Sequence, residues 1–309
     1  MTPEPSSGRQ FELRHGRQRA VVVEVGGELR ELEVDGRPVL DGYALHRMAD
    51  GARGQPLLPW PNRLGDGRYV FGGQTLQLPI DEVERGNAIH GLTRWLNWSL
   101  AEKAPDRARL ELMVHPRPGY PFALQLSIGY TLSDGGLNVR TTARNVGGDR
   151  LPFGAGYHPY FTVGTPLVDS ATLRMAARSS LELDAERRLP TGRVLPVAGS
   201  ENDFREARPI GASVLDACLT ELERDSDGRA RVTLSDPGGG TSVVVWMEER
   251  FRYLQIFSGD TLAPDRRRRS LAIEPMTCPP DAFRTQIDLI VLEPDEAVSL
   301  EWGLLLTGI

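Results

Sequence analysis

Apolar and polar residues alternate at every second position through much of the chain. The alternation is clear in RARLELMV at 107–114, across 122–146, which turns at SDGG, and across 231–247. Shorter apolar runs, rich in β-branched or aromatic residues, lie at 20–25 and 253–259. A period of two residues is typical of strands that bury one face and expose the other. We therefore predict an all-β protein with few helices.

Two further segments have the pattern of hairpins. Residues 69–79 contain the pair Gly72-Gly73 between two short alternating runs, and paired glycines favour a tight turn between antiparallel strands. Residues 287–306 contain the turn-forming sequence EPDE at 293–296 between two apolar runs. Both are predicted to fold as adjacent strand pairs.

The chain shows no internal repeat, no low-complexity linker and no abrupt change of composition. Its 309 residues are within the range of one large all-β domain. We predict a single domain over 1–309, a large antiparallel β-sandwich, with residues 1–10 as a disordered lead-in. Two stacked sheets would bury one side chain in two along each strand.

Composition narrows the classes of function. A net charge of -6 argues against a general nucleic-acid binder, which needs a basic surface. No apolar run approaches the ~20 residues of a membrane span, and the N-terminal residues lack the apolar region of a signal peptide. Cys218 and Cys278 have no metal-ligand spacing. We expect a cytoplasmic protein with no nucleic-acid or membrane partner, and the sequence leaves its oligomeric state open.

The stretch FGAGYHPYF at 153–161 places His158 among glycines and aromatic residues. Flat apolar rings and the absence of side-chain bulk at the glycines could form a wall for a sugar-sized ligand. The alternative is a buried histidine that packs at the end of a strand. His90, in GNAIHGLTRW, has a turn before it and Gly91 after it.

A second stretch, LPWPNRLGDG, contains Trp60, Asn62 and Arg63. Trp60, between two prolines, is a candidate stacking platform for a ligand. Arg63 could reach an acceptor in a cleft, or it could pair with a nearby carboxylate. The residue types leave both interpretations open.

Two carboxylates interrupt apolar runs. Glu274 follows Leu271, Ala272 and Ile273 and precedes a proline, so that its carboxyl group would be desolvated and its pKa raised toward neutrality. The alternative is a surface glutamate at a frayed strand end. Asp216 interrupts SVLDACLTEL, where sugar hydroxyls, backbone N–H groups or an arginine would satisfy it equally well.

Together these motifs resemble the aldose 1-epimerase family, also called mutarotases. They occur in order as Asn62-Arg63 with Gly67, His90-Gly91, GYHPYF at 156–161, LDACLT at 215–220 and IEPMTCPPDAF at 273–283. The match spans the chain from about residue 56 onward. The resemblance implies a large antiparallel β-sandwich that binds a sugar on a concave face.

The resemblance also implies roles for individual residues. Glu274 would be the general base that takes the proton from the anomeric hydroxyl, and His158 the general acid that protonates the ring oxygen. His90 would assist His158 or orient the sugar ring. The chemistry of these residue types agrees, because opening a hemiacetal needs one proton removed from O1 and one delivered to the ring oxygen. We expect the two groups to lie on opposite sides of the sugar.

By the same resemblance, Asp216, Arg63 and Asn62 would bind the sugar. The reaction calls for no metal and no cofactor. The run RRRR at 266–269, together with Arg94, leaves a hexose-6-phosphate 1-epimerase as an alternative. The residues would also be compatible with a non-catalytic carbohydrate-binding protein, or with a glycoside hydrolase that uses two carboxylates.

Overall fold

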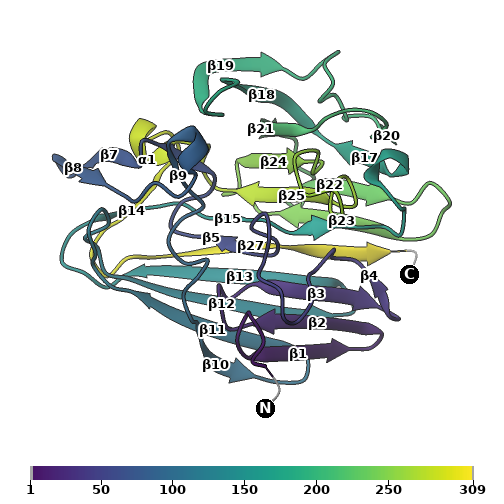
Figure 1. Cartoon of the computed structure of the whole chain (residues 1–309), viewed down its shortest axis with the longest axis horizontal. Helices are drawn as coiled ribbons and strands as arrows, with labels where there is room; N and C mark the ends of the chain where they lie inside the picture. Colours follow the sequence, from purple (N-terminus) through teal and green to yellow (C-terminus); the bar gives the residue numbers. More distant parts are fainter. Residues whose placement is uncertain (1–2, 308–309) are drawn as a thin grey trace.

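A computed structural model describes residues 3–307 and contains two large sheets whose neighbouring strands run antiparallel. The first sheet has nine strands, and β27, near the C-terminal end of the chain, lies in its middle between β13 and β23 (Figure 1). Its strands, in spatial order, are β10 (Ser99–Lys103), β11 (Arg107–Val114), β12 (Leu124–Ser133), β13 (Gly136–Asn145), β27 (Ala297–Thr307), β23 (Ser242–Met247), β22 (Ala230–Ser235), β17 (Thr172–Met175) and β20 (Arg208–Pro209).

The second sheet has eight strands and carries the residues that matter most below. Seven of its strands follow one path, and β16 (Tyr160–Phe161) pairs with β25 outside that path. The path runs β19 (Pro190–Pro196), β18 (Ala177–Leu183), β21 (Asp216–Leu222), β24 (Tyr253–Phe257), β25 (Leu271–Met276), β15 (Gly156–Tyr157) and β5 (Pro56–Leu57).

Smaller sheets complete the fold. Figure 1 shows the N-terminal four-stranded sheet next to the first large sheet, and β1 contacts β11 and β12. This sheet consists of β1 (Gln10–His15), β2 (Gln18–Val23), β3 (Leu29–Val34) and β4 (Arg37–Pro38). Three strand pairs are β6 (Arg63–Gly65) with β9 (Asn87–Ile89), β7 (Arg68–Phe71) with β8 (Gln74–Gln77), and β14 (Leu151–Phe153) with β26 (Ile290–Leu292).

Helical structure in residues 3–307 is limited to three short pieces. They are η1 (Val83–Arg85), η2 (Val168–Ser170) and α1 (Ala282–Thr285). A membrane-spanning helix is absent from residues 3–307. The all-β antiparallel fold predicted from the two-residue period is therefore confirmed.

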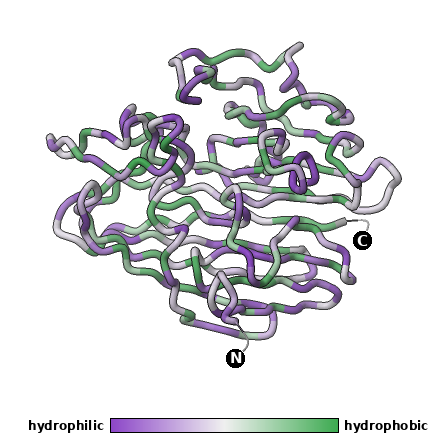
Figure 2. The backbone as a smooth tube through the Cα atoms, viewed as in Figure 1, coloured by the Kyte–Doolittle hydropathy of each residue, from purple (hydrophilic) through white to green (hydrophobic). Residues whose placement is uncertain are grey.

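The alternation separates a core face from a site face in the second large sheet. Leu219, Leu254 and Ile273 point into the main hydrophobic core, which also includes residues of the first sheet such as Ile128 and Leu300. Their neighbours in sequence face the opposite side, where Glu274 is located. Figure 2 shows apolar and polar positions following one another most clearly along the long strands of the first large sheet.

Most predicted hairpins form, but one does not. β7 and β8 pair around Gly72-Gly73, and β12 pairs with β13 around the SDGG turn. The predicted hairpin over 287–306 is wrong, because β26 pairs with β14 while β27 pairs with β13 and β23. Both edges of β27 are thus already occupied inside the large sheet, so the 293–296 turn connects strands of different sheets.

The expected lead-in is tied to the rest of the molecule over its described part. The backbone N–H of Ser6 donates to the carbonyl of Leu45, and that of Val25 donates to the carbonyl of Ser7. Ser7 is buried, and β1 begins at Gln10. Residues 1–2 of the expected lead-in lie outside the described residues.

Candidate active site

The ladder register brings His158 opposite Glu274. Gly156 of β15 pairs with Met276 and Tyr160 of β16 pairs with Ala272, so that residue 158, between these two strands, faces residue 274 of β25. The Nε2 atom of His158 lies 3.2 Å from Oε1 of Glu274. The HPYF and EP motifs therefore meet by β-pairing although they are more than a hundred residues apart in sequence.

This geometry differs from the arrangement expected from the sequence. The two groups are in contact on one wall of the site and do not lie on opposite sides of a sugar-sized space. A donor and an acceptor on one wall can still serve O1 and the ring oxygen of a sugar, because both oxygens are bonded to C1.

Burial dominates the electrostatics of the pair. Glu274 is 1% exposed, and desolvation followed by the charge of Asp216 raises the pKa of its carboxyl group well above the usual value. Desolvation and the charge of Arg53 lower the pKa of His158 to about 3. Both shifts favour the neutral form of each group, so burial disfavours the protonated imidazole that a general acid at His158 requires.

Each member of the pair has a polar atom to spare. Among the described residues, neither Oε2 of Glu274 nor Nδ1 of His158 has a hydrogen-bond partner, although both atoms are buried. A buried polar atom without a partner is costly, and such atoms are expected at sites that bind a ligand. Oε2 can accept a hydrogen bond from a sugar hydroxyl.

Two backbone segments bring His90 beside this pair. The N–H of His90 donates to the carbonyl of Asn62, and the N–H of Asn62 donates to Nδ1 of His90. His90 and Asn62 have positive φ angles, 63° and 56°. Such angles are uncommon for residues other than glycine, and they concentrate at functional sites. The hydrogen bond to Nδ1 leaves the proton on Nε2, so His90 can act as a hydrogen-bond donor.

His90 is also held as a neutral group. Burial and then the charge of Arg94 lower its pKa well below the usual value. Its ring meets that of His158 edge to face, with centroids 5.4 Å apart. The absence of a side chain at Gly91 allows the backbone next to His90 to pass close to Leu58, because a Cβ atom at residue 91 would lie 2.0 Å from the carbonyl oxygen of Leu58.

Arg63 is paired with a carboxylate. Its Nε and Nη2 atoms contact Glu82 at 2.8 Å each, and Asn87 donates to Oε2 of the same carboxylate at 2.8 Å. Burial opposes ionisation of Glu82, but the bonds from Arg63 and Asn87 outweigh it and hold its pKa below the usual value. Of the two interpretations of Arg63 from the sequence, the structure shows the ion pair, at the edge of the cavity.

Asp216 is held by two side chains. Arg188 lies 2.9 Å from Oδ2, and Gln255 donates to Oδ1 at 2.7 Å. Gln255 in turn accepts a long hydrogen bond, 3.5 Å, from Asn62. This chain of contacts connects the Asp216 wall with the His90 loop.

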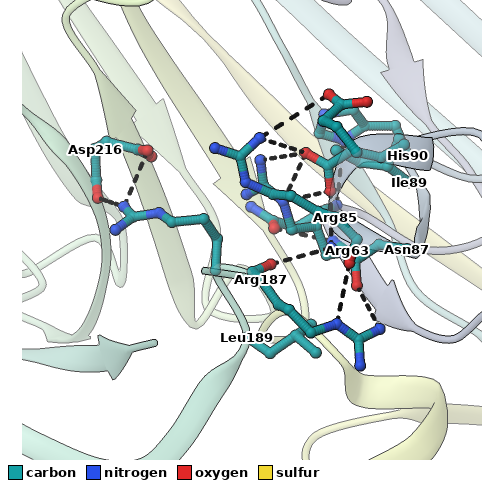
Figure 3. A network of polar contacts seen from close by, with 12 residues as sticks. Arg63, Arg85, Asn87, Ile89, His90, Arg187, Leu189 and Asp216 are labelled. Atoms are coloured by element: carbon teal, nitrogen blue, oxygen red, sulfur yellow. Dashed lines mark hydrogen bonds and ion pairs between the residues drawn. The ribbon is translucent and has the colours of Figure 1, made fainter. Parts of the chain in front are cut away.

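Arg187, next to Arg188 in sequence, connects its loop to the segments that contain Asp66 and Asn87. Arg187 donates to Asp66 at 2.9 Å, to Asn87 at 3.2 Å and to the carbonyl of Gly86 at 2.8 Å. Figure 3 shows Asp216 on one side of the network and Asn87 on the other, with Arg187 between them. We call residues 184–189 the clamp loop, since its two arginines fasten both walls.

One cavity of about 500 Å3 collects the six residues to which the sequence analysis assigned catalytic or sugar-binding roles. These are Asn62, Arg63, His90, His158, Asp216 and Glu274. The cavity is within the size range of small-molecule sites, ~300–1,000 Å3. Within residues 3–307, no cluster of His, Cys, Asp and Glu is arranged to hold a metal ion.

Most of the aromatic residues proposed for the cavity are in the core. Trp60 is only 3% exposed and packs on Phe283 with ring centroids 5.3 Å apart, so it is not a stacking platform. Phe153, Tyr157 and Phe161 are likewise in the hydrophobic core. Of the aromatic side chains in 153–161, only Tyr160 lines the cavity. The alternation of β15 and β16 turns the remaining ones away from the site.

The arginine run is mainly structural. Arg266 pairs with Asp41 at 2.9 Å, and Arg268 pairs with Asp169 and Asp260 at 2.9 and 2.8 Å. None of the four arginines lines the cavity.

Sequence reasoning missed several residues of this site. Arg53, Glu82 and Arg188 lie in loops whose composition carries no distinctive pattern. Gln255 had a detectable signal, because a lone amide in the apolar strand YLQIF needs a partner.

The fold and the site define the class: a large β-sandwich with a buried carboxyl–imidazole pair in the wall of a polar cavity. The sequence profile of the family named aldose 1-epimerase matches residues 9–304. The Escherichia coli protein YihR, whose function is uncharacterised, is 33% identical over 288 residues, which cover 93% of this chain and 90% of that protein. The chain therefore belongs to the aldose 1-epimerase family.

Two further comparisons agree. The galactose mutarotase of Rattus norvegicus is 26% identical over 227 residues, covering 67% of this chain and 64% of that protein. A solved structure of a GalM/aldose epimerase homologue from C. elegans superposes with a TM-score of 0.87 at 16% identity, covering 97% of this chain and 99% of that one. The second similarity shows a shared fold.

Proposed function

We propose that this protein is an aldose 1-epimerase that interconverts the α and β anomers of a free hexose of the glucose or galactose type. The observation that carries the proposal is the contact of Glu274 with His158 in the wall of the cavity, where Oε2 of Glu274 has no partner among the described residues. Family membership supports a carbohydrate epimerase.

The pair works with a single proton. A sugar hydroxyl that donates to Oε2 of Glu274 stabilises the carboxylate, and the proton passes across the 3.2 Å contact to Nε2 of His158. Glu274 then takes the proton from O1 while His158 gives its proton to the ring oxygen. The O1–H electron pair forms the carbonyl bond as the bond from C1 to the ring oxygen breaks.

The second half-reaction reverses these transfers. Rotation about the bond from C1 to C2 exposes the opposite face of the aldehyde, and the ring hydroxyl attacks it. His158 recovers the proton from this hydroxyl, and Glu274 returns one to O1. The pair ends with the proton count with which it began, so the cycle requires no cofactor.

The surrounding residues hold the sugar. His90 donates from Nε2, because its Nδ1 already accepts the N–H of Asn62. Asp216 and Asn62 present acceptor and amide groups to sugar hydroxyls, and Arg63 bounds the cavity while paired with Glu82. Because these groups are anchored before binding, little ordering is needed when the sugar binds.

The charges of the cavity favour a free sugar over a hexose 6-phosphate. Besides Glu274, its lining contains four carboxyl groups and three guanidinium groups. Arg63 and Arg85 pair with Glu82, and Arg94 pairs with Asp81. A phosphate group would have to compete with these carboxylates for each arginine.

Polarimetry tests the proposal. We expect the protein to accelerate the change in rotation of freshly dissolved α-D-glucose or α-D-galactose, and His158→Asn and Glu274→Gln each to remove most of the acceleration. A parallel assay with glucose 6-phosphate separates the substrate classes, because faster anomerisation of the phosphate would overturn the free-sugar assignment. Sugar binding without acceleration by the unaltered protein would instead identify a non-catalytic carbohydrate-binding protein.

A further inference from the structure

Three planar groups are stacked behind the candidate acid–base pair. The ring of Tyr160 lies against that of His158, with centroids 4.9 Å apart and planes inclined by 18°. The guanidinium carbon of Arg53 lies 4.1 Å from the centroid of the Tyr160 ring. Arg53 is 2% exposed, so the cation faces an aromatic ring in a largely desolvated setting, where such contacts are strongest.

The stack takes the place of a missing hydrogen bond. The orientation of a functional histidine is usually set by a bond from its second ring nitrogen to a carbonyl or carboxylate. Nδ1 of His158 has no such partner in residues 3–307. The ring of Tyr160 instead stacks on the His158 ring, and the ring of His90 packs against it at nearly a right angle.

Both ends of the stack are fixed. Arg53 donates to the carboxylate and the carbonyl of Asp41, at 2.9 Å each, and to Asp50 at 3.3 Å. The hydroxyl of Tyr160 donates to the carbonyl of Gly51 at 3.0 Å. The backbone of His158 is bonded on both sides to the residues that follow Arg53, because its N–H donates to Gln55 and its carbonyl accepts from Gly54.

The charges around His158 come from several elements. Glu274 of β25 is in contact with it, and His90 meets its ring. Arg53, Arg94 and Arg63 each oppose a positive charge on the imidazole, and Arg53 has the largest effect of the three. Removing Arg53 would also leave Asp41 and Asp50 with less positive charge nearby, and this would favour protonation of His158 further.

We propose that Arg53 and Tyr160 are positioning residues, which hold the imidazole of His158 as the third layer of a fixed cation–aromatic stack with Nε2 directed at Glu274. This role rests on the proposed epimerase function. Neither residue needs to touch the sugar's reacting atoms to exert it. Loss of the stack allows the imidazole ring of His158 to rotate and allows the Glu274–His158 pair to bind a second proton.

The variant Arg53→Met tests the role, and Arg266→Met is the matched control. Arg266 also contacts Asp41 at 2.9 Å, but it is not part of the stack. We expect Arg53→Met to lower kcat by about tenfold or more with KM within about twofold, and to move the acid limb of kcat/KM upward by at least about one pH unit. Arg266→Met should keep the parental kcat and pH profile.

Two conservative variants separate charge from shape. Arg53→Lys keeps the cation and should restore the position of the acid limb, while kcat recovers only partly because an ammonium group cannot stack in the same way. Tyr160→Phe keeps the stacked ring and should retain most of the activity, whereas Tyr160→Leu should behave like Arg53→Met. If Arg53→Met does not fold, the two Tyr160 variants still decide the question.

Direct titration of His158 by NMR gives a readout that does not depend on activity. With His158→Asn to assign the signal, we expect no titration of this ring in the parent between about pH 4.5 and 8, and a midpoint inside that range in Arg53→Met. An unchanged titration and pH profile in a folded Arg53→Met would overturn the proposal, even if kcat fell. If the parent protein lacks epimerase activity but the titrations are as expected, the proposed function is contradicted while the positioning role of the stack is supported.

Discussion

The cavity has two regions that are built differently: the proton-transfer region, formed by Glu274 and His158, and the clamp region, formed by the ion pairs Arg63–Glu82 and Arg188–Asp216. In the first, Glu274 and His158 are buried, both have shifted pKa values, and each keeps one polar atom without a partner among the described residues. In the second, Arg63 pairs with Glu82 and Arg188 with Asp216. This difference indicates that Glu274 and His158 are free to interact with a ligand, whereas the ion pairs mainly hold the walls of the cavity in place.

The two regions therefore contribute differently to the stability of the folded protein. Neutral, partly unsatisfied groups reduce stability and are retained where chemistry needs them. Paired ions in a half-buried setting contribute rigidity, and breaking one pair leaves an uncompensated charge. We therefore expect substitutions in the two regions to affect different measurable quantities.

The largest expected effect is that of Glu274→Gln on turnover. Removal of the proton acceptor should lower kcat by about 10^3-fold, within the range for general acid–base catalysis, while KM stays within about threefold. Steady-state polarimetry measures both. Glu248→Gln removes another desolvated carboxyl group, outside the cavity, and should leave both constants unchanged. Residual activity above a tenth of the parental value would contradict the role of Glu274.

The next largest effect is expected on stability in the clamp region. Glu82→Gln leaves the guanidinium of Arg63 without its carboxylate, and we expect a loss of about 2 kcal/mol in the free energy of unfolding. Urea denaturation followed by circular dichroism measures it. Glu182→Gln, which breaks the more exposed pair with Arg193, should cost less than about 0.5 kcal/mol. Equal losses for the two variants would show that burial of the first pair is unimportant.

A smaller effect should appear in substrate affinity. Arg188→Ala removes the partner of Asp216, and the carboxylate then loses its fixed orientation toward the cavity. We expect KM to rise by about tenfold, equivalent to about 1.4 kcal/mol, with kcat within about threefold. Arg193→Ala is the matched control on the neighbouring strand β19. A fall in kcat with unchanged KM would contradict this prediction and would indicate that Asp216 acts in proton transfer and not in sugar binding.

The smallest effect concerns the pH dependence of stability. The folded protein raises the pKa of Glu274 above its usual value of 4.5, so the folded state binds more protons than the unfolded state above that pH, and stability falls as the pH rises through this window. Glu274→Gln removes this penalty. We expect a gain of about 1 kcal/mol at pH 8 and a smaller one at pH 5, measured by thermal unfolding. Equal gains at both pH values would indicate that desolvation of the carboxylate is not the cause.

Much of the fold could be predicted because its information is local. The two-residue period of 107–114 and 122–146 reports directly which side chains are buried, and the SDGG and Gly72-Gly73 turns specify adjacent pairing. The 287–306 prediction failed for the same reason. A local turn pattern cannot reveal that both edges of β27 are taken by β13 and β23.

The antiparallel β fold and six of the residues that line the cavity could be read from the chain, because alternation and short motifs involve neighbouring positions. Their arrangement in space depends on contacts between distant segments. The register of β25 against β15 and β16 put His158 in contact with Glu274, alternation sent Trp60 and Phe153 to the core, and loops without distinctive composition supplied Arg53 and Arg188. Desolvation, pairing and stacking depend on which distant segments meet, and that information lies in no single stretch of the chain.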